Sequence, residues 1–118
     1  MPKRFIRSFK YAQDGVRYAL QSQRNMWIHS VLAFAVLTAA VSLRVSVTEW
    51  LFIIAMIALV FAFELINTAL EEVVNMLKPE PHPLAALAKN SSAAAVLVMS
   101  GGAAIVGLII FLPKILNL

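Results

Sequence analysis

The sequence predicts an all-α integral membrane protein, in which one amphipathic surface helix precedes three transmembrane helices. The chain has 118 residues, of which 61% are hydrophobic and only 14% charged, and its mean hydropathy is +0.83. Soluble domains average roughly 45–50% apolar and about 25% charged residues. The apolar residues also form blocks close to the ~20 residues that a helix needs to cross a bilayer. These observations exclude an ordinary soluble domain, and the absence of cysteine from the sequence excludes a disulfide scaffold and thiolate chemistry.

The first predicted element, residues 4–23, is a basic amphipathic helix. Its apolar residues recur at helical spacing and form one stripe, with basic residues on the opposite face. The stripe consists of Phe5, Phe9, Ala12, Val16, Ala19 and Leu20. Basic amphipathic helices next to membrane spans are typical of the bilayer interface, so we expect this helix to lie in the plane of the membrane surface.

Three apolar segments follow and together predict a single membrane domain over residues 1–118. The first span, 26–43, and the third, 91–112, carry no formal charge, whereas the second, 50–77, becomes polar toward its end. Three prolines between the second and third spans exclude a helix there. A short amphipathic stretch over 84–89 is expected to lead into the third span, which Pro113 is expected to end.

The distribution of basic residues predicts the topology. Eight of the ten Lys and Arg residues precede the first span or lie between the second and third, and only Arg44 and Lys114 lie on the other side. The positive-inside rule therefore predicts a cytoplasmic N-terminus and an external C-terminus. Three spans bury little surface alone, so we expect self-association, and the small residues at 100–104 predict a close approach of two helices.

A polar stripe on the second span indicates a site. Its members lie at offsets 0, 3, 4, 7 and 11, which places them on one face of an α-helix. They are Glu64, Asn67, Thr68, Glu71 and Asn75. Glu64 lies roughly 21 Å along the helix from Trp50, and Glu71 about 10 Å further toward the cytoplasm. Polar groups at this depth are costly unless they face protein, water or ions.

Two interpretations of the stripe are open. Asn67 and Thr68 could hydrogen-bond to a neighbouring helix and serve packing alone. Alternatively, Glu71 could bind Mg²⁺, which proteins hold through one or two carboxylates together with phosphate oxygens, and Glu64 could act as a general base on a lipid hydroxyl. The second carboxylate on the same face favours the chemical interpretation.

Polar residues outside the stripe fall at the same end of the molecule. Lys89 and the backbone N–H groups as far as Ser92 could hold phosphate where the third span opens; the alternative is a snorkelling lysine and an N-capping serine. Gln23 lies in register with the apolar stripe of the first helix and is expected to face whatever that helix covers. His82 lies in the proline loop, and an ordinary surface polar residue is the alternative interpretation for both Gln23 and His82.

No glycine-rich phosphate loop occurs in the sequence, so the binding of a nucleotide would depend on metal, carboxylates and lysine.

Six blocks between about Arg4 and Lys114 form a specific pattern. They are Arg24–His29, Thr48–Trp50, Glu64–Glu71, His82–Ala85, Ala88–Lys89 and Gly107–Lys114. Through these blocks, and above all the signature E-L-x-N-[ST]-A-x-E, the chain resembles the small prokaryotic diacylglycerol kinase family, most closely its undecaprenol kinase branch. The resemblance implies a homotrimer in the bacterial plasma membrane, with active sites shared between protomers at the cytoplasmic interface. It also implies phosphorylation of the hydroxyl of undecaprenol or diacylglycerol by ATP with Mg²⁺.

The resemblance also implies individual roles. Glu64 corresponds to the catalytic base and Asn67 to an active-site asparagine, while Glu71 and the position of Gln23 correspond to the metal site. Thr68 and Asn75 complete the polar stripe. The positions implied in nucleotide binding are Arg4, Tyr11, Glu80, His82, Lys89 and Asn90.

Four positions depart from the family pattern. The family has glutamate at Gln23, aspartate at Asn75 and Asn90, and tyrosine at Pro81. An amide oxygen can still bind Mg²⁺, but it carries no charge, so the affinity for the metal should fall. The loss of the tyrosine removes a surface on which adenine could stack.

Three functions therefore remain to be compared. The first is an active lipid kinase. The second is a catalytically weakened or inactive member of the same fold, which binds lipid or nucleotide without turnover and is favoured by the three amides. The third is a channel, which the gathering of charges at one membrane face disfavours.

Overall fold

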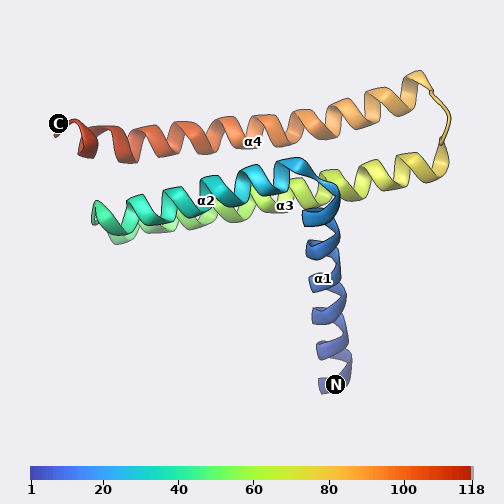
Figure 1. The fold of residues 1–118 in the computed structure, drawn as a ribbon, viewed down its shortest axis with the longest axis horizontal. Helices are drawn as coiled ribbons and strands as arrows, with labels where there is room; N and C mark the ends of the chain where they lie inside the picture. Colours follow the sequence, from blue (N-terminus) through green and yellow to red (C-terminus); the bar gives the residue numbers. More distant parts are fainter. Residues whose placement is uncertain (118) are drawn as a thin grey trace.

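The computed structural model describes residues 1–117, which form four helices and no strand. They are α1 (Pro2–Ser22), α2 (Arg24–Ser42), α3 (Val47–Leu77) and α4 (Pro83–Ile115). Figure 1 shows α2, α3 and α4 running alongside one another, while α1 projects away from them. The last three helices are long and apolar enough to cross a membrane. The predicted all-α fold, with three helices able to span a membrane, is thereby confirmed, whereas the location of α1 on a membrane surface stays a prediction.

The start of α3 lies three residues before the predicted one because Ser46 caps the helix. The hydroxyl of Ser46 accepts a hydrogen bond from the backbone N–H of Glu49 at 3.1 Å, and the Glu49 carboxylate accepts one from the Ser46 N–H at 2.9 Å. This reciprocal capping box satisfies two backbone donors that would otherwise have no partner at the helix end.

The helix that contains the third predicted span is longer than that span at both ends. The stretch over 84–89 and the span over 91–112 form one continuous helix that begins at Pro83. Proline suits the first position of a helix, because its φ is already helical and the missing N–H has no partner there. Pro113 lies inside the helix, which ends at Ile115. So close to the end, proline removes a single hydrogen bond and its fixed φ still continues the helix.

Helix α3 organises the packing of the other helices. Near the turn between α2 and α3, the residues Ala40, Val45, Ile53 and Ile110 form a buried apolar cluster. A Cβ added at Gly101 or at Gly102 would meet nothing within 4 Å. These two glycines therefore do not face another helix closely within the single chain.

The lengths of α3 and α4 carry one end of the bundle beyond the hydrocarbon layer. At 1.5 Å per residue, α3 is about 46 Å long and α4 about 50 Å, compared with about 30 Å for the hydrocarbon core. The loop that joins α3 to α4 and the junction of α1 with α2 lie toward the same end of the bundle (Figure 1). The polar residues of α3 lie toward this same end of the helix.

The capping box gives a test of the fold. We expect Ser46→Ala to lower the free energy of unfolding by about 1 kcal/mol, because the Glu49 N–H loses its acceptor. Thr48→Ala, a change at the exposed second residue of the same helix, is the matched control and should have little effect. Thermal unfolding in detergent measures both, and equal stability of the two variants would contradict the capping role.

Candidate functional site

The polar stripe of α3 faces the protein and not the lipid. Glu64, Asn67 and Thr68 are buried, with 0%, 6% and 5% of their surface exposed. Glu71 is half-buried and Asn75 is exposed. The stripe therefore runs from the interior of the bundle to its surface, as the helical spacing predicts.

Glu64 is paired with a histidine of the neighbouring helix. The Nε2 atom of His29 on α2 lies 3.0 Å from Oε1 of Glu64, whereas Oε2 has no hydrogen-bond partner among the described residues. A buried acceptor without a partner costs about 1–3 kcal/mol, so this oxygen is available to a further donor. His29 was not among the predicted site residues. A lone imidazole in an uncharged span was the signal that could have identified it.

Glu71 is held by two amides from different parts of the chain. Gln23 donates from Nε2 to Oε2 of Glu71 at 3.1 Å, and Asn67 donates from Nδ2 to Oε1 at 3.4 Å. Gln23 occupies the extended break between α1 and α2, with φ −118° and ψ 115°. This break turns its side chain toward α3, in agreement with the predicted direction. Each Glu71 oxygen keeps a second lone pair for another ligand.

Asn67 also links α3 to α4. Its Oδ1 accepts a hydrogen bond of 2.6 Å from the hydroxyl of Ser92. Thr68 instead donates at 2.9 Å to the backbone carbonyl of Glu64 within its own helix. The hydrogen bond to a neighbouring helix that the packing interpretation requires is therefore present for Asn67 and absent for Thr68.

The predicted phosphate site at the start of the third span is wrong in its backbone part. Because α4 begins at Pro83, the N–H groups from Lys89 to Ser92 lie within the helix and are not free. Ser92 is not an N-cap either. The N-cap is His82, whose Nδ1 accepts a hydrogen bond from the Leu84 N–H at 3.1 Å.

A second group of predicted residues surrounds a cavity of about 450 Å³ at the loop between α3 and α4. Glu80, His82 and Lys89 line it, together with Asn75 of the polar stripe. The Lys89 ammonium donates to Oδ1 of Asn75, which joins this cavity to the polar face of α3. Pro81 lines it as well.

Three predicted nucleotide-binding residues are not brought to this cavity within one chain. Asn90 is exposed and does not line it. Arg4 and Tyr11 lie on α1, which projects away from the bundle (Figure 1). They are exposed in the single chain.

A tyrosine anchors the end of α1 to α3. The hydroxyl of Tyr18 donates to Oε1 of Glu72 at 2.7 Å, and Ala19 beside it is fully buried. The hydrogen bond to the Glu72 carboxylate raises the pKa of Tyr18 above its ordinary value, because it favours the protonated phenol.

The oxygen donors around Glu71 are compatible with Mg²⁺. The described residues contain no group of three or more His, Asp or Glu side chains arranged to hold a metal ion. Mg²⁺, however, commonly takes one or two carboxylates and completes its shell with water and substrate phosphates. The Glu71 carboxylate would provide one such ligand. The Gln23 amide, whose Nε2 faces Glu71 in this structure, would provide its oxygen after a rotation of the amide group, with one charge fewer than two carboxylates would give.

Three of the helices are long and apolar enough to cross a membrane, and α3 turns the carboxylates of Glu64 and Glu71 toward the protein. This arrangement defines a membrane protein with a polar site at the edge of its helical bundle. The family model described as prokaryotic diacylglycerol kinase matches residues 10–111. The chain therefore belongs to the prokaryotic diacylglycerol kinase family, and the resemblance seen in the sequence is confirmed.

Three relatives illustrate the match. The undecaprenol kinase of Bacillus subtilis (strain 168) is 39% identical over 112 residues, which cover 95% of this chain and 91% of that protein. The diacylglycerol kinase of Synechocystis sp. is 42% identical over 94% of this chain, which spans 64% of that longer protein. The diacylglycerol kinase of Haemophilus influenzae is 30% identical over 79% of each chain. Family and relatives together support a bacterial membrane-bound lipid kinase.

The contact between Tyr18 and Glu72 gives a test by titration. Replacing Glu72 by glutamine should return the raised pKa of Tyr18 toward its ordinary value near 10.0. The stabilisation from this contact is present at neutral pH and is lost as the pH rises through the raised pKa. Tyrosinate absorbance measures the shift, with Tyr18→Phe subtracted to remove the signal of the other tyrosine. An unchanged titration in Glu72→Gln would contradict the contact.

Proposed function

We propose that this protein is an ATP- and Mg²⁺-dependent lipid kinase that phosphorylates the hydroxyl of undecaprenol or diacylglycerol. One observation carries the proposal: Glu64, fully buried with one free oxygen, and Glu71, half-buried near the bundle end, share an inward face. They lie about 10 Å apart along α3. This spacing suits a proton acceptor at the lipid hydroxyl and a separate site for the phosphates.

Glu64 is the proposed general base. When Glu64 is ionised, His29 must be the donor at Nε2, because a carboxylate only accepts hydrogen bonds. Oε1 is then occupied and Oε2 is left to take the proton of the lipid hydroxyl. The lipid oxygen forms the new bond to the γ-phosphorus, the bond from that phosphorus to the β,γ-bridging oxygen breaks, and ADP leaves with that electron pair.

Glu71 and Gln23 are the proposed ligands of Mg²⁺ bound with ATP. The bound ion would neutralise phosphate charge during the transfer. Lys89, which donates to Asn75, lies nearer the loop between α3 and α4 than Glu71 does, and its ammonium group can contact the phosphates. Asn67 orients Glu71 through the hydrogen bond that its amide donates. Glu80 and His82 line the adjoining cavity, which we assign to the rest of the nucleotide. Catalysis in this scheme is positioning and charge stabilisation.

We further propose a homotrimer with a cytoplasmic N-terminus and an external C-terminus. The basic residues at the α1 end and in the loop between α3 and α4 support this topology. Arg4 and Tyr11 are exposed and do not reach the cavity of their own chain. In an assembly with shared sites they would contact the nucleotide bound to a neighbouring protomer.

A member of the family without turnover is the second candidate. The observation that favours it is the neutral Gln23 beside Glu71, where the amide replaces a charge at the proposed metal site. Asn75 and Asn90 remove two more charges from the same end of the molecule. This candidate would bind lipid or nucleotide at the same residues and transfer no phosphate.

The role of Glu64 is tested by replacing it with glutamine, the corresponding amide. Glu64→Gln keeps the size of the side chain but removes the proton acceptor, and we expect kcat to fall about 100-fold or more. Glu49→Gln makes the same change at the far end of α3, where glutamine still fits a capping box, and should leave kcat within about two-fold. Transfer of labelled phosphate from ATP to each lipid measures both. Equal activity of the parent and Glu64→Gln would contradict the base.

The effect of the missing negative charge at position 23 is tested by introducing a carboxylate there. Gln23→Glu should lower the Mg²⁺ concentration for half-maximal activity about ten-fold, which corresponds to ~1.4 kcal/mol of added metal affinity. If the parent transfers no phosphate, the double change Gln23→Glu with Asn90→Asp should create activity, and the second candidate function then describes the parent. An unchanged Mg²⁺ requirement would contradict the placement of the ion at Gln23 and Glu71.

A further inference from the structure

Helix α4 begins with a histidine as its N-cap. The His82 backbone is extended, with φ −147° and ψ 135°, and its carbonyl accepts a hydrogen bond from the Ala86 N–H at 3.0 Å. Its side chain accepts another, at Nδ1, from the Leu84 N–H at 3.1 Å. Pro83, which lies between them in the sequence, has no N–H to donate. The imidazole thus satisfies one of the backbone donors that a helix leaves unpaired at its start.

A histidine N-cap depends on protonation in a way that the usual N-caps do not. Serine, threonine, aspartate and asparagine are the preferred residues, and their oxygens accept hydrogen bonds throughout the neutral range. Histidine is the side chain whose charge ordinarily changes between about pH 5 and 8. A neutral imidazole that accepts at Nδ1 carries its proton at Nε2, whereas an imidazolium donates from both nitrogens and accepts nothing. The cap of α4 therefore exists only while His82 is neutral.

Protonation of His82 opposes the cap in two ways. The Leu84 N–H loses its acceptor, and the new positive charge lies at the end of α4 where the helix dipole is also positive. The imidazole is half-buried, so protons from water can reach it. The charged groups that line the loop cavity with it are Lys78 at the end of α3, Glu80 in the loop and Lys89 on α4. An imidazolium here meets two like charges and one opposite charge.

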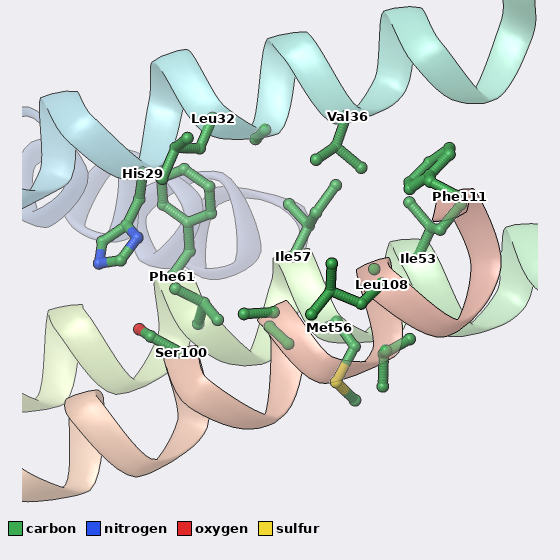
Figure 2. A pocket seen from close by; sticks show the side chains of 16 residues that line it. His29, Leu32, Val36, Ile53, Met56, Ile57, Phe61, Ser100, Leu108 and Phe111 are labelled. Atoms are coloured by element: carbon green, nitrogen blue, oxygen red, sulfur yellow. The ribbon is translucent and has the colours of Figure 1, made fainter. Parts of the chain in front are cut away.

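The other histidine of the chain lies in a different environment. Figure 2 shows His29 of α2 at an apolar groove between α2, α3 and α4, with Phe61 beside it. The two rings meet edge to face with their centroids 6.4 Å apart, and Nε2 of His29 is bonded to Glu64. Of the two histidines, only His82 caps a helix and lines the loop cavity.

The residues that follow the cap form one wall of the loop cavity. Ala85 and Ala86, in the first turn of α4, line this cavity of about 450 Å³, as does Lys89 one turn further on. The Lys89 ammonium also donates to Asn75 of α3, on the opposite side. This wall is therefore built on the turn that His82 caps.

We propose that His82 is a pH-sensitive cap that regulates the binding of the nucleotide at the loop cavity. The inference rests on the proposed kinase function, which assigns this cavity to the nucleotide, and adds its regulation. At neutral pH the cap orders the first turn of α4 and with it the cavity wall. As the pH falls, His82 gains a proton, the Leu84 N–H is released and the wall loses order. Acidification thus weakens nucleotide binding by up to about five-fold, the limit set by the loss of one N-cap.

Two variants of His82 separate the cap from other effects of pH. His82→Asn keeps an N-cap acceptor that gains no charge in acid, whereas His82→Ala has no cap at any pH. Binding of a non-hydrolysable ATP analogue with Mg²⁺ to the protein in detergent is measured at about pH 7.5 and about pH 5.5, within the range over which histidine gains a proton. Dividing the Kd of the parent by that of His82→Asn cancels the titration of the analogue and of the other side chains.

The ratio for the parent should rise about two- to five-fold on acidification. His82→Ala should bind about two- to five-fold more weakly than His82→Asn at both pH values. A constant ratio for the parent, or equal binding by the two variants, would overturn the inference and leave the kinase function standing. A parent that binds no analogue at either pH would instead refute the proposed function, and the cap itself is then decided by NMR.

Nitrogen NMR of the protein labelled in its histidine rings tests the cap without a ligand. The chain has two histidines, and His82→Asn removes the signals of one, which assigns both. At about pH 7.5 we expect His82 to carry its proton at Nε2 alone, and at about pH 5.5 to be protonated at both nitrogens. Exchange of the Leu84 amide hydrogen should be faster in the parent than in His82→Asn only at the lower pH. A neutral His82 with its proton at Nδ1, or equal exchange in the two proteins at the lower pH, would refute the pH-sensitive cap.

Discussion

Polar side chains that lie buried or half-buried along α3 require polar partners, and these partners connect α3 to every other helix. His29 reaches Glu64 from α2, and Ser92 reaches Asn67 from α4. At the bundle end, Gln23 holds Glu71 and Tyr18 holds Glu72, which fixes the α1–α2 junction. Without a hydrophobic driving force between helices in lipid, such contacts contribute specificity to the assembly. The same contacts leave the carboxylates prearranged for chemistry.

The neutral amide at position 23 illustrates how stability and function compete at this site. Two carboxylates at the positions of Gln23 and Glu71 would repel each other in the absence of a metal ion. The amide replaces this repulsion with a hydrogen bond of 3.1 Å and so stabilises the metal-free protein. The same substitution removes negative charge from a site proposed to hold Mg²⁺. The metal-free protein therefore favours glutamine at position 23, whereas the metal-bound protein would favour glutamate.

The hydrophobic pattern predicted the four helical segments, and the spacing of polar residues predicted the inward face of α3. Helix ends were less predictable, because proline and serine act differently according to position. Pro83 begins α4 and Pro113 does not end it, whereas Ser46 extends α3 beyond its apolar run. The misplaced start of α4 led directly to a phosphate site at Lys89 whose backbone N–H groups are already bonded.

Contacts between helices could be predicted only where a repeated pattern indicates them. Glu64, Asn67 and Glu71 repeat along one face, but His29 belongs to no repeated polar pattern in its span. Nothing in its local sequence says which helix it faces. The surroundings of Arg4 and Tyr11 depend on the placement of α1 relative to the bundle, which the periodicity of α1 does not predict.

In the proposed kinase, one face of α3 brings a lipid hydroxyl and the phosphates of ATP together. The most direct measurement is an experimental structure in lipid with Mg²⁺, a non-hydrolysable ATP analogue and a lipid alcohol. We expect the metal ion bound directly by Glu71, and the alcohol oxygen within hydrogen-bond distance of Glu64 Oε2, about 2.6–3.2 Å. A structure in which the nucleotide and metal occupy another surface, with Glu64 turned toward bulk lipid, would contradict the claim.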